Sequence, residues 1–190
     1  MIQAPKLHSI GILYNPISGS GEALETANSL QQLLIKHGYT AHLIQSQPKE
    51  RKNLLFEPLQ RLDALIALGG DGTMLCLLDI LLELQLPIYL MPFGNECLFS
   101  KEFQMSKKPS DVLKVIKKNT IVESYVAFAN NESFLTMLSI GFDSKVVEHI
   151  ANKRTGPINK LDYAFAIIKK ALKHHPPKIT LQIELSLIHI

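Results

Sequence analysis

Residues 65–73 read Leu-Ile-Ala-Leu-Gly-Gly-Asp-Gly-Thr, a short apolar run that leads into three closely spaced glycines. The apolar run is typical of a buried strand, and the following stretch from Met74 to Leu84 is typical of a helix. A glycine loop between a buried strand and a helix start is a place where phosphate can meet backbone N–H groups and the helix dipole. The stretch therefore predicts that this chain binds a nucleotide.

The residue types in this glycine loop suit an anionic ligand. Glycine lets the backbone approach a ligand without an intervening Cβ, while Asp71 offers a carboxylate and Thr73 a hydroxyl at the helix entrance. A second interpretation needs no ligand, because Gly-Gly-Asp-Gly can be a tight turn in which Asp71 or Thr73 caps the following helix. The motif alone leaves both interpretations open.

Length and composition set the class of protein. The chain has 190 residues, of which 46% are hydrophobic and 19% charged, as expected of a globular protein with a substantial core. Its formal net charge of +3 suits anionic substrates or an anionic membrane surface. This charge is too small for a nucleic-acid-binding footprint, so we expect no nucleic-acid partner.

Cysteine usage and hydropathy predict the compartment. Cys76 and Cys97 are far apart and have no metal-ligand spacing, which favours a reducing compartment. The first ten residues lack the apolar core of a signal peptide, and no apolar run reaches the ~20 residues of a membrane span. We therefore expect a cytoplasmic protein, with Cys76 buried on the apolar face of its helix.

The first part of the chain alternates strand-like and helix-like segments. Strands are expected at residues 10–14, 40–44, 62–68 and 87–91, and helices at residues 22–37 and 74–84. This alternation predicts a parallel α/β sheet. Ligands collect at the carboxyl ends of such strands, which is where residues 15–21, 69–73 and 92–96 fall. Three loops are therefore expected to converge on one edge of the sheet.

The pattern changes near residue 120. Ser110 or Asp111 is expected to cap a short helix that ends near Lys118. Beyond it, the expected elements are a hairpin of residues 121–129 and 134–142, helices at 146–152 and 161–173, and a strand at 178–190. These patterns predict an α/β nucleotide-binding domain at residues 1–119 and an incomplete β-rich second domain at residues 120–190. Its last strand would invite pairing with a second copy, as a homo-oligomer.

Three segments carry a family resemblance. Residues 15–21 read Asn-Pro-Ile-Ser-Gly-Ser-Gly, residues 69–73 read Gly-Gly-Asp-Gly-Thr, and residues 141–143 read Gly-Phe-Asp. They resemble the N-P-x-S-G-x-G, G-G-D-G-T and G-F-D segments of the diacylglycerol kinase catalytic domain family. This family includes sphingosine kinases and bacterial lipid kinases and shares its glycine motif with NAD kinases.

The resemblance implies a fold and a reaction. A three-layer, parallel-sheet α/β domain of the NAD kinase/diacylglycerol kinase type and a following β-sandwich would enclose ATP between them. The implied reaction transfers the γ-phosphoryl group of ATP, with Mg²⁺, to a hydroxyl of a lipid or lipid-like acceptor. A lipid acceptor implies transient contact with a membrane surface. The alternatives are an NAD kinase-like phosphotransferase and a degenerate or truncated protein that binds nucleotide without catalysis.

The resemblance also implies roles for individual residues. Asp71 would hold the metal and is a candidate base, as is Asp143, whose other interpretation is a helix cap. The residues assigned to the nucleotide are Asn15, Ser18, Gly19, Gly69, Gly70, Gly72, Thr73, Gly94, Asn95 and Glu96.

One loop departs from the family pattern. Residues 92–97 read Pro-Phe-Gly-Asn-Glu-Cys where the family usually has P-x-G-T-x-N, so Asn95 replaces a threonine and Cys97 an asparagine. A thiol is a poorer hydrogen-bonding group than an amide. We expect nucleotide binding to survive this change more easily than turnover.

Overall fold

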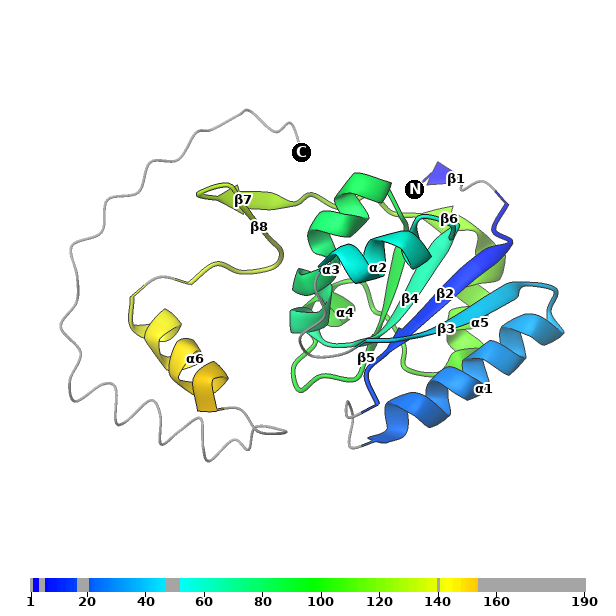
Figure 1. The fold of residues 1–190 in the computed structure, drawn as a ribbon, viewed down its shortest axis with the longest axis horizontal. Helices are drawn as coiled ribbons and strands as arrows, with labels where there is room; N and C mark the ends of the chain where they lie inside the picture. Colours follow the sequence, from blue (N-terminus) through cyan, green and yellow to red (C-terminus); the bar gives the residue numbers. More distant parts are fainter. Residues whose placement is uncertain (1, 4–5, 17–20, 47–51, 140, 154–190) are drawn as a thin grey trace. The chain divides into compact units, whose positions relative to one another are not determined.

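The computed structural model describes residues 2–3, 6–16, 21–46, 52–139 and 141–153 (Figure 1). The chain divides into two compact units, residues 1–138 and residues 139–190. The first unit holds the central sheet and its loops, and the second contains helix α6 at Phe142–Lys153. The predicted domain boundary after residue 119 stays a prediction.

A four-stranded parallel sheet forms the centre of the first unit. Its strands are β2 (Ser9–Tyr14), β3 (Thr40–Gln45), β4 (Ala64–Gly69) and β5 (Ile88–Pro92), in the order β3-β2-β4-β5. Both neighbours of the fully buried strand β4 run parallel to it. The predicted α/β fold class is confirmed, and the strand bounds differ from the predicted ones by no more than two residues.

Helices cover both faces of this sheet and complete three layers (Figure 1). Helices α1 (Glu22–Lys36) and α5 (Pro109–Lys118) pack on one face, and α2 (Lys52–Leu59), α3 (Asp71–Leu84) and α4 (Leu98–Glu102) pack on the other. Successive strand residues point to opposite faces. Ile12 and Ile66 accordingly join the α1 and α5 core, whereas Leu13 and Leu65 join the α2 and α3 core.

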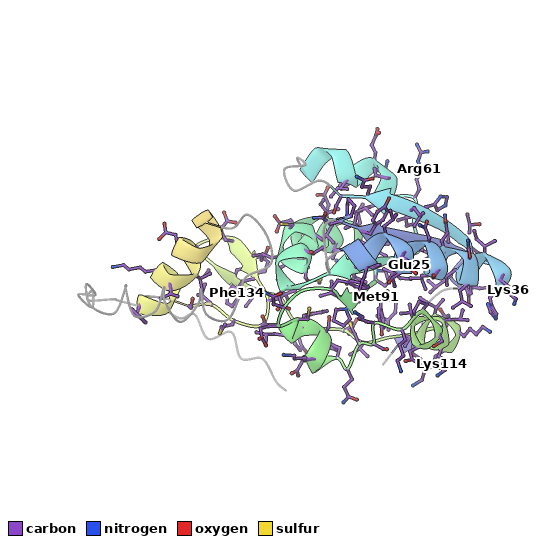
Figure 2. The ribbon with its side chains drawn as sticks, turned by 90° about the horizontal axis from the view of Figure 1, so that it is seen from below. Glu25, Lys36, Arg61, Met91, Lys114 and Phe134 are labelled. Carbon is purple, nitrogen blue, oxygen red and sulfur yellow. The ribbon has the colours of Figure 1, made fainter. Side chains whose placement is uncertain are left out.

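Side-chain positions agree with this layering (Figure 2). Met91 of β5 is fully buried, while Lys36 of α1 and Lys114 of α5 are exposed at the surface. The apolar stripe that the sequence predicts for the first helix, Ala23, Ala27, Leu30 and Leu34, is buried as a whole. One residue of α3 departs from the pattern predicted by the sequence. Cys76 is exposed, so the prediction that it is buried is wrong.

The predicted hairpin forms, but its strands are much shorter than expected. Strands β7 (Ala127–Ala129) and β8 (Glu132–Phe134) pair antiparallel around Asn130 and Asn131, which both have positive φ, as in the tight turns that suit hairpins. The rest of the predicted first strand contributes only β6 (Thr120–Ile121), which pairs with β1 (Ile2–Gln3). Residues 135–139 are not strand. Helix α6 contains the whole of the helix predicted at 146–152 and begins four residues before it.

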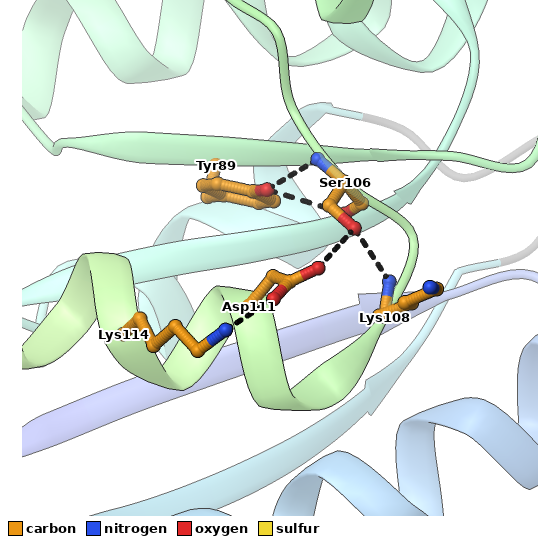
Figure 3. A network of polar contacts seen from close by, with 5 residues as sticks. All are labelled: Tyr89, Ser106, Lys108, Asp111 and Lys114. Carbon is orange, nitrogen blue, oxygen red and sulfur yellow. Dashed lines mark hydrogen bonds and ion pairs between the residues drawn. The ribbon is translucent and has the colours of Figure 1, made fainter.

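The connection before α5 is held by a polar network rather than by the predicted cap (Figure 3). Helix α5 begins at Pro109 and has no side-chain cap from its N-cap residue. The Ser106 hydroxyl instead donates to Asp111 at 3.0 Å, and Lys114 pairs with the same carboxylate at 2.9 Å. The backbone N–H of Ser106 donates to the Tyr89 hydroxyl at 2.6 Å, which ties this connection to β5. The prediction that Ser110 or Asp111 caps the helix is therefore wrong.

The predicted helix at 161–173 and strand at 178–190 lie outside the described residues. Among the helices of the described ranges, none combines the length and the apolar character needed to cross a membrane.

Candidate nucleotide-binding site

The carboxyl ends of three adjacent strands meet at one edge of the sheet, as the sequence predicts. Tyr14 of β2 is paired with Leu68 of β4, and Gly69 of β4 is paired with Pro92 of β5. The residues that follow these strands therefore start side by side. Asn15 comes after β2, and Ser18 and Gly19, assigned to the same loop, lie outside the described residues.

The loops after β4 and β5 cross in close contact. The backbone N–H of Phe93 donates to the carbonyl of Gly69 at 2.8 Å. A Cβ at Gly94 would lie 2.8 Å from the Cα of Gly70, and a Cβ at Gly70 would lie 3.1 Å from the Cα of Gly94. A Cβ at Gly94 would force the two backbones apart, and a Cβ at Gly70 would make an unusually tight contact. The crossing itself thus favours glycine at both positions, most strongly at Gly94.

Gly69 is also required by packing. A Cβ at this position would collide with the side chain of Thr73, whose own Cβ would lie only 2.6 Å away. The Thr73 N–H donates to the Gly70 carbonyl at 2.9 Å, which closes the first turn of α3. Thr73 therefore sits against the start of the helix rather than capping it from outside.

Gly72 differs from the other glycines of this edge. It lies in the first turn of α3, has no left-handed φ, and among the described residues nothing lies within 4 Å of the Cβ that another residue would add. Neither a turn nor a close approach within the fold demands glycine here. The open space lies at a helix N-terminus, where backbone N–H groups and the helix dipole favour an anion.

Asp71 makes its contacts across the site. Its two carboxylate oxygens accept hydrogen bonds from the backbone N–H groups of Leu98 and Phe99, each at 2.9 Å. Leu98 and Phe99 are the first two residues of α4. Asp71 therefore caps α4, not the helix α3 to which it belongs. The sequence missed this partner, because a carboxylate in a loop does not indicate which distant helix end it will meet.

Cys97 fills the space beneath the crossing. It is 4% exposed and adopts a left-handed backbone, with φ of 48°. Its thiol accepts a hydrogen bond from the Gly94 N–H at 3.2 Å and lies 3.8 Å from the Gly69 carbonyl, to which it donates. Burial raises the pKa of this thiol. Cys97 is thus a neutral link between the two loops.

A hollow of about 430 Å³ opens between the end of β5 and α4. Its lining includes three residues that the sequence assigns to the nucleotide, Gly94, Asn95 and Glu96, and also Ser100, Lys101 and Gln104. Glu96 pairs with Lys101 at 2.9 Å, and both side chains are more than half exposed. This hollow adjoins the crossing loops through Gly94 and Cys97.

The predicted site residues after β4 and β5, Gly69 to Thr73 and Gly94 to Glu96, are gathered at one place. Asn15 follows β2 at the same sheet edge. Asp143 lies in the first turn of α6, in the second unit. Its candidate role stays a prediction.

The described residues do not form a complete metal site by themselves. Within the described ranges, no group of three or more His, Cys, Asp or Glu side chains is placed to hold one. The carboxylate assigned to Mg²⁺, Asp71, already accepts two backbone hydrogen bonds. Mg²⁺ commonly relies on one or two carboxylates together with substrate phosphates. Any metal would have to be held largely by the nucleotide.

Comparisons with known proteins indicate the family. A diacylglycerol kinase of Mycobacterium tuberculosis is 26% identical over 180 residues, covering 89% of this chain and 58% of the relative. An uncharacterized protein of Synechocystis sp. is 22% identical over 172 residues, covering 84% of this chain and 40% of the relative. The chain thus spans little more than half the length of the first relative.

A solved structure has the same fold. The crystal structure of a diacylglycerol kinase from Bacillus anthracis str. Sterne matches with a TM-score of 0.56 and 25% identity, covering 69% of this chain and 49% of that one. Residues 9–128, which include the whole parallel sheet, α3 and the crossing loops, match the diacylglycerol kinase catalytic domain. The chain therefore belongs to the diacylglycerol kinase catalytic domain family.

Proposed function

We propose that this chain binds the phosphates of ATP at the N-terminus of α3 and takes part in transfer of the γ-phosphoryl group to a hydroxyl of a lipid or lipid-like acceptor. The observation that carries the nucleotide site is Gly72, a glycine that the fold does not require. A Cβ there would enter the space next to the helix N-terminus, where a phosphate would sit.

The chemistry of such a site is mainly positioning and charge neutralisation. Backbone N–H groups at the start of α3 would bind phosphate oxygens, and the helix dipole adds a partial positive charge of about half a unit. Asn15, Asn95 and the loops they occupy border the same sheet edge and would shape the rest of the nucleotide pocket. Mg²⁺ bound to the ATP phosphates would neutralise charge that develops during transfer.

The acceptor is proposed from the family alone. The relative from M. tuberculosis carries the name diacylglycerol kinase, and a lipid hydroxyl is the matching acceptor class. Contact with a membrane surface is proposed on the same ground. A cytoplasmic location and a homo-oligomeric state are proposed from the sequence alone. Asp143 is our candidate for the base that takes the acceptor proton.

A second candidate function is nucleotide binding without transfer. It is favoured by one observation: the Asp71 carboxylate, the acidic group of the glycine loop, is already bound to backbone N–H groups of α4. A chain that binds ATP but transfers no phosphoryl group to diacylglycerol in mixed micelles would support this candidate.

The experiment is calorimetric titration with ATP of the wild type and the Gly72→Ala variant, together with thermal unfolding. We expect Gly72→Ala to lower ATP affinity by about tenfold or more, which corresponds to roughly 1.4 kcal/mol. Its melting temperature should equal or exceed that of the wild type, because alanine favours a helix over glycine. The matched control is Cys76→Ala, at an exposed position of the same helix, which should change neither quantity. Equal affinity for wild type and Gly72→Ala would contradict the proposed site.

A further inference from the structure

We infer that Asp71 is a positioning residue: it holds the start of α4 against the glycine loop and thereby sets the geometry of the nucleotide site. The expected effect of Asp71 on ATP affinity rests on the proposed function. Its expected effect on the position of α4 does not.

The first support is the completeness of the contact. Each Asp71 oxygen accepts one backbone N–H at 2.9 Å, from Leu98 and from Phe99. The first N–H groups of a helix have no partner within the helix. The N-cap residue of α4, Cys97, supplies no side-chain cap. Asp71 therefore provides the cap from the neighbouring loop.

The second support is the place of this contact in the site. It joins positions 27 and 28 residues apart in the chain. It lies beside the Gly70–Gly94 crossing and the Cys97 thiol, which join the same two loops. The loop of residues 93–97 is thus held at both ends, by β5 on one side and by Asp71 through α4 on the other. Release of α4 would loosen the end of this loop that contains Asn95 and Glu96.

The third support is that this cap has no substitute. Loss of the carboxylate would leave two N–H groups at the start of α4 without their acceptors. The described residues offer no other side-chain cap for these two groups.

A base, a metal ligand and a positioning residue differ in how ATP affinity should change when the carboxylate is removed. A carboxylate near phosphates repels them, so its loss alone should strengthen ATP binding in the absence of metal. Loss of a metal ligand should weaken binding only when Mg²⁺ is present, and loss of a base should weaken binding in neither condition. A positioning residue should weaken binding both with Mg²⁺ and in EDTA.

The test is ATP titration of Asp71→Asn and Asp71→Ala in EDTA and in Mg²⁺. We expect Asp71→Ala to lower affinity about fivefold in both conditions, the loss expected from disordering one hydrogen-bonded contact. Asp71→Asn keeps one acceptor oxygen and should fall between the wild type and Asp71→Ala. Weakening confined to Mg²⁺, or tighter binding in EDTA, would overturn the inference.

The chain offers a matched control in Asp63. Its carboxylate also accepts two backbone N–H groups, from His8 at 2.7 Å and Ser9 at 2.8 Å, at the opposite edge of the sheet. Asp63→Ala should lower the melting temperature but leave ATP affinity unchanged. A similar loss of affinity in Asp63→Ala would show that general destabilisation, not positioning, explains the effect.

Amide hydrogen exchange supplies a readout that needs no nucleotide. Exchange at Leu98 and Phe99 should accelerate in Asp71→Ala and stay at the wild-type rate in Asp63→Ala. If the wild type binds no ATP, the proposed function fails, but this comparison still decides whether Asp71 holds α4. Unchanged exchange at both amides in Asp71→Ala would overturn the inference.

Discussion

Gly94→Ala should disrupt the crossing of the two loops that the nucleotide site depends on. The added Cβ would lie 2.8 Å from the Cα of Gly70 and 3.2 Å from the sulfur of Cys97. Non-bonded carbon atoms prefer separations of about 3.5–4.0 Å, so the two backbones would have to separate by roughly 0.7 Å. A side chain could rotate out of the way, but a backbone Cα cannot.

The magnitude follows from the cost of overpacking. Such insertions typically cost about 1–3 kcal/mol, and we expect about 2 kcal/mol here because the contact is with backbone. The separation would also lengthen the 2.8 Å hydrogen bond from the Phe93 N–H to the Gly69 carbonyl. The variant should therefore lose both stability and ATP affinity.

Urea denaturation measures the first effect, and Gly38→Ala is its control. Gly38 has a φ of +85° but, among the described residues, nothing within 4 Å of an added Cβ. Alanine there should cost about 1 kcal/mol through backbone strain alone, at the C-terminal end of α1 and away from the crossing. It should leave ATP affinity unchanged. A Gly94→Ala protein with wild-type stability and affinity would refute the argument that the crossing requires glycine.

Three further predictions follow from the surroundings of the site. In native protein a thiol reagent should modify the exposed Cys76 promptly and Cys97 slowly, because burial both shields Cys97 and raises its pKa; equal rates would contradict this. The two backbone hydrogen bonds to Asp63 lower its pKa, so its stabilisation is present above the unfolded pKa of about 4 and is lost as pH falls through the lower folded value. The loss of stability in Asp63→Asn, measured in urea at several pH values, should accordingly shrink below about pH 4. Ser133 donates to Asp79 at 2.6 Å and links the hairpin to α3, so Ser133→Ala should cost about 1 kcal/mol and speed amide exchange in β7 and β8.

The sheet could be predicted from sequence because its signals are local. Strand β4 is an uninterrupted apolar run that ends at a glycine pair, and α1 carries its apolar residues at helical spacing before Gly38. These patterns report burial directly, so the bounds of the predicted strands lie close to the observed ones. The parallel direction of the strands followed from the alternation of strands with helices, whereas their order was not predicted.

The errors occurred where the outcome depends on distant partners. Residues 121–129 have strand-like composition, but only β6 and β7 find partners within the described residues. Asp111 has the right residue type for a cap, yet Ser106 and Lys114 compete for its carboxylate. Cys76 was placed on a buried face by its apolar neighbours, although the positions of α3 that face the core are Met74, Leu77, Leu78, Ile80 and Leu81. Helix α4 could not be predicted at all, since its cap comes from Asp71, 27 residues earlier.

The structure explains part of the glycine motif by contacts within the fold. Gly69 and Gly70 are explained by contacts within the fold, and Asp71 is a cap, although for α4 rather than for α3. Most of the motif is therefore needed to bring the two loops together, whatever they bind. Gly72 is left with no such explanation among the described residues. A ligand needs backbone atoms that the rest of the fold does not cover. Glycine at position 72 leaves such atoms accessible. Alanine at Gly72 should thus impair binding without harming the fold, whereas alanine at Gly70 or Gly94 should harm both.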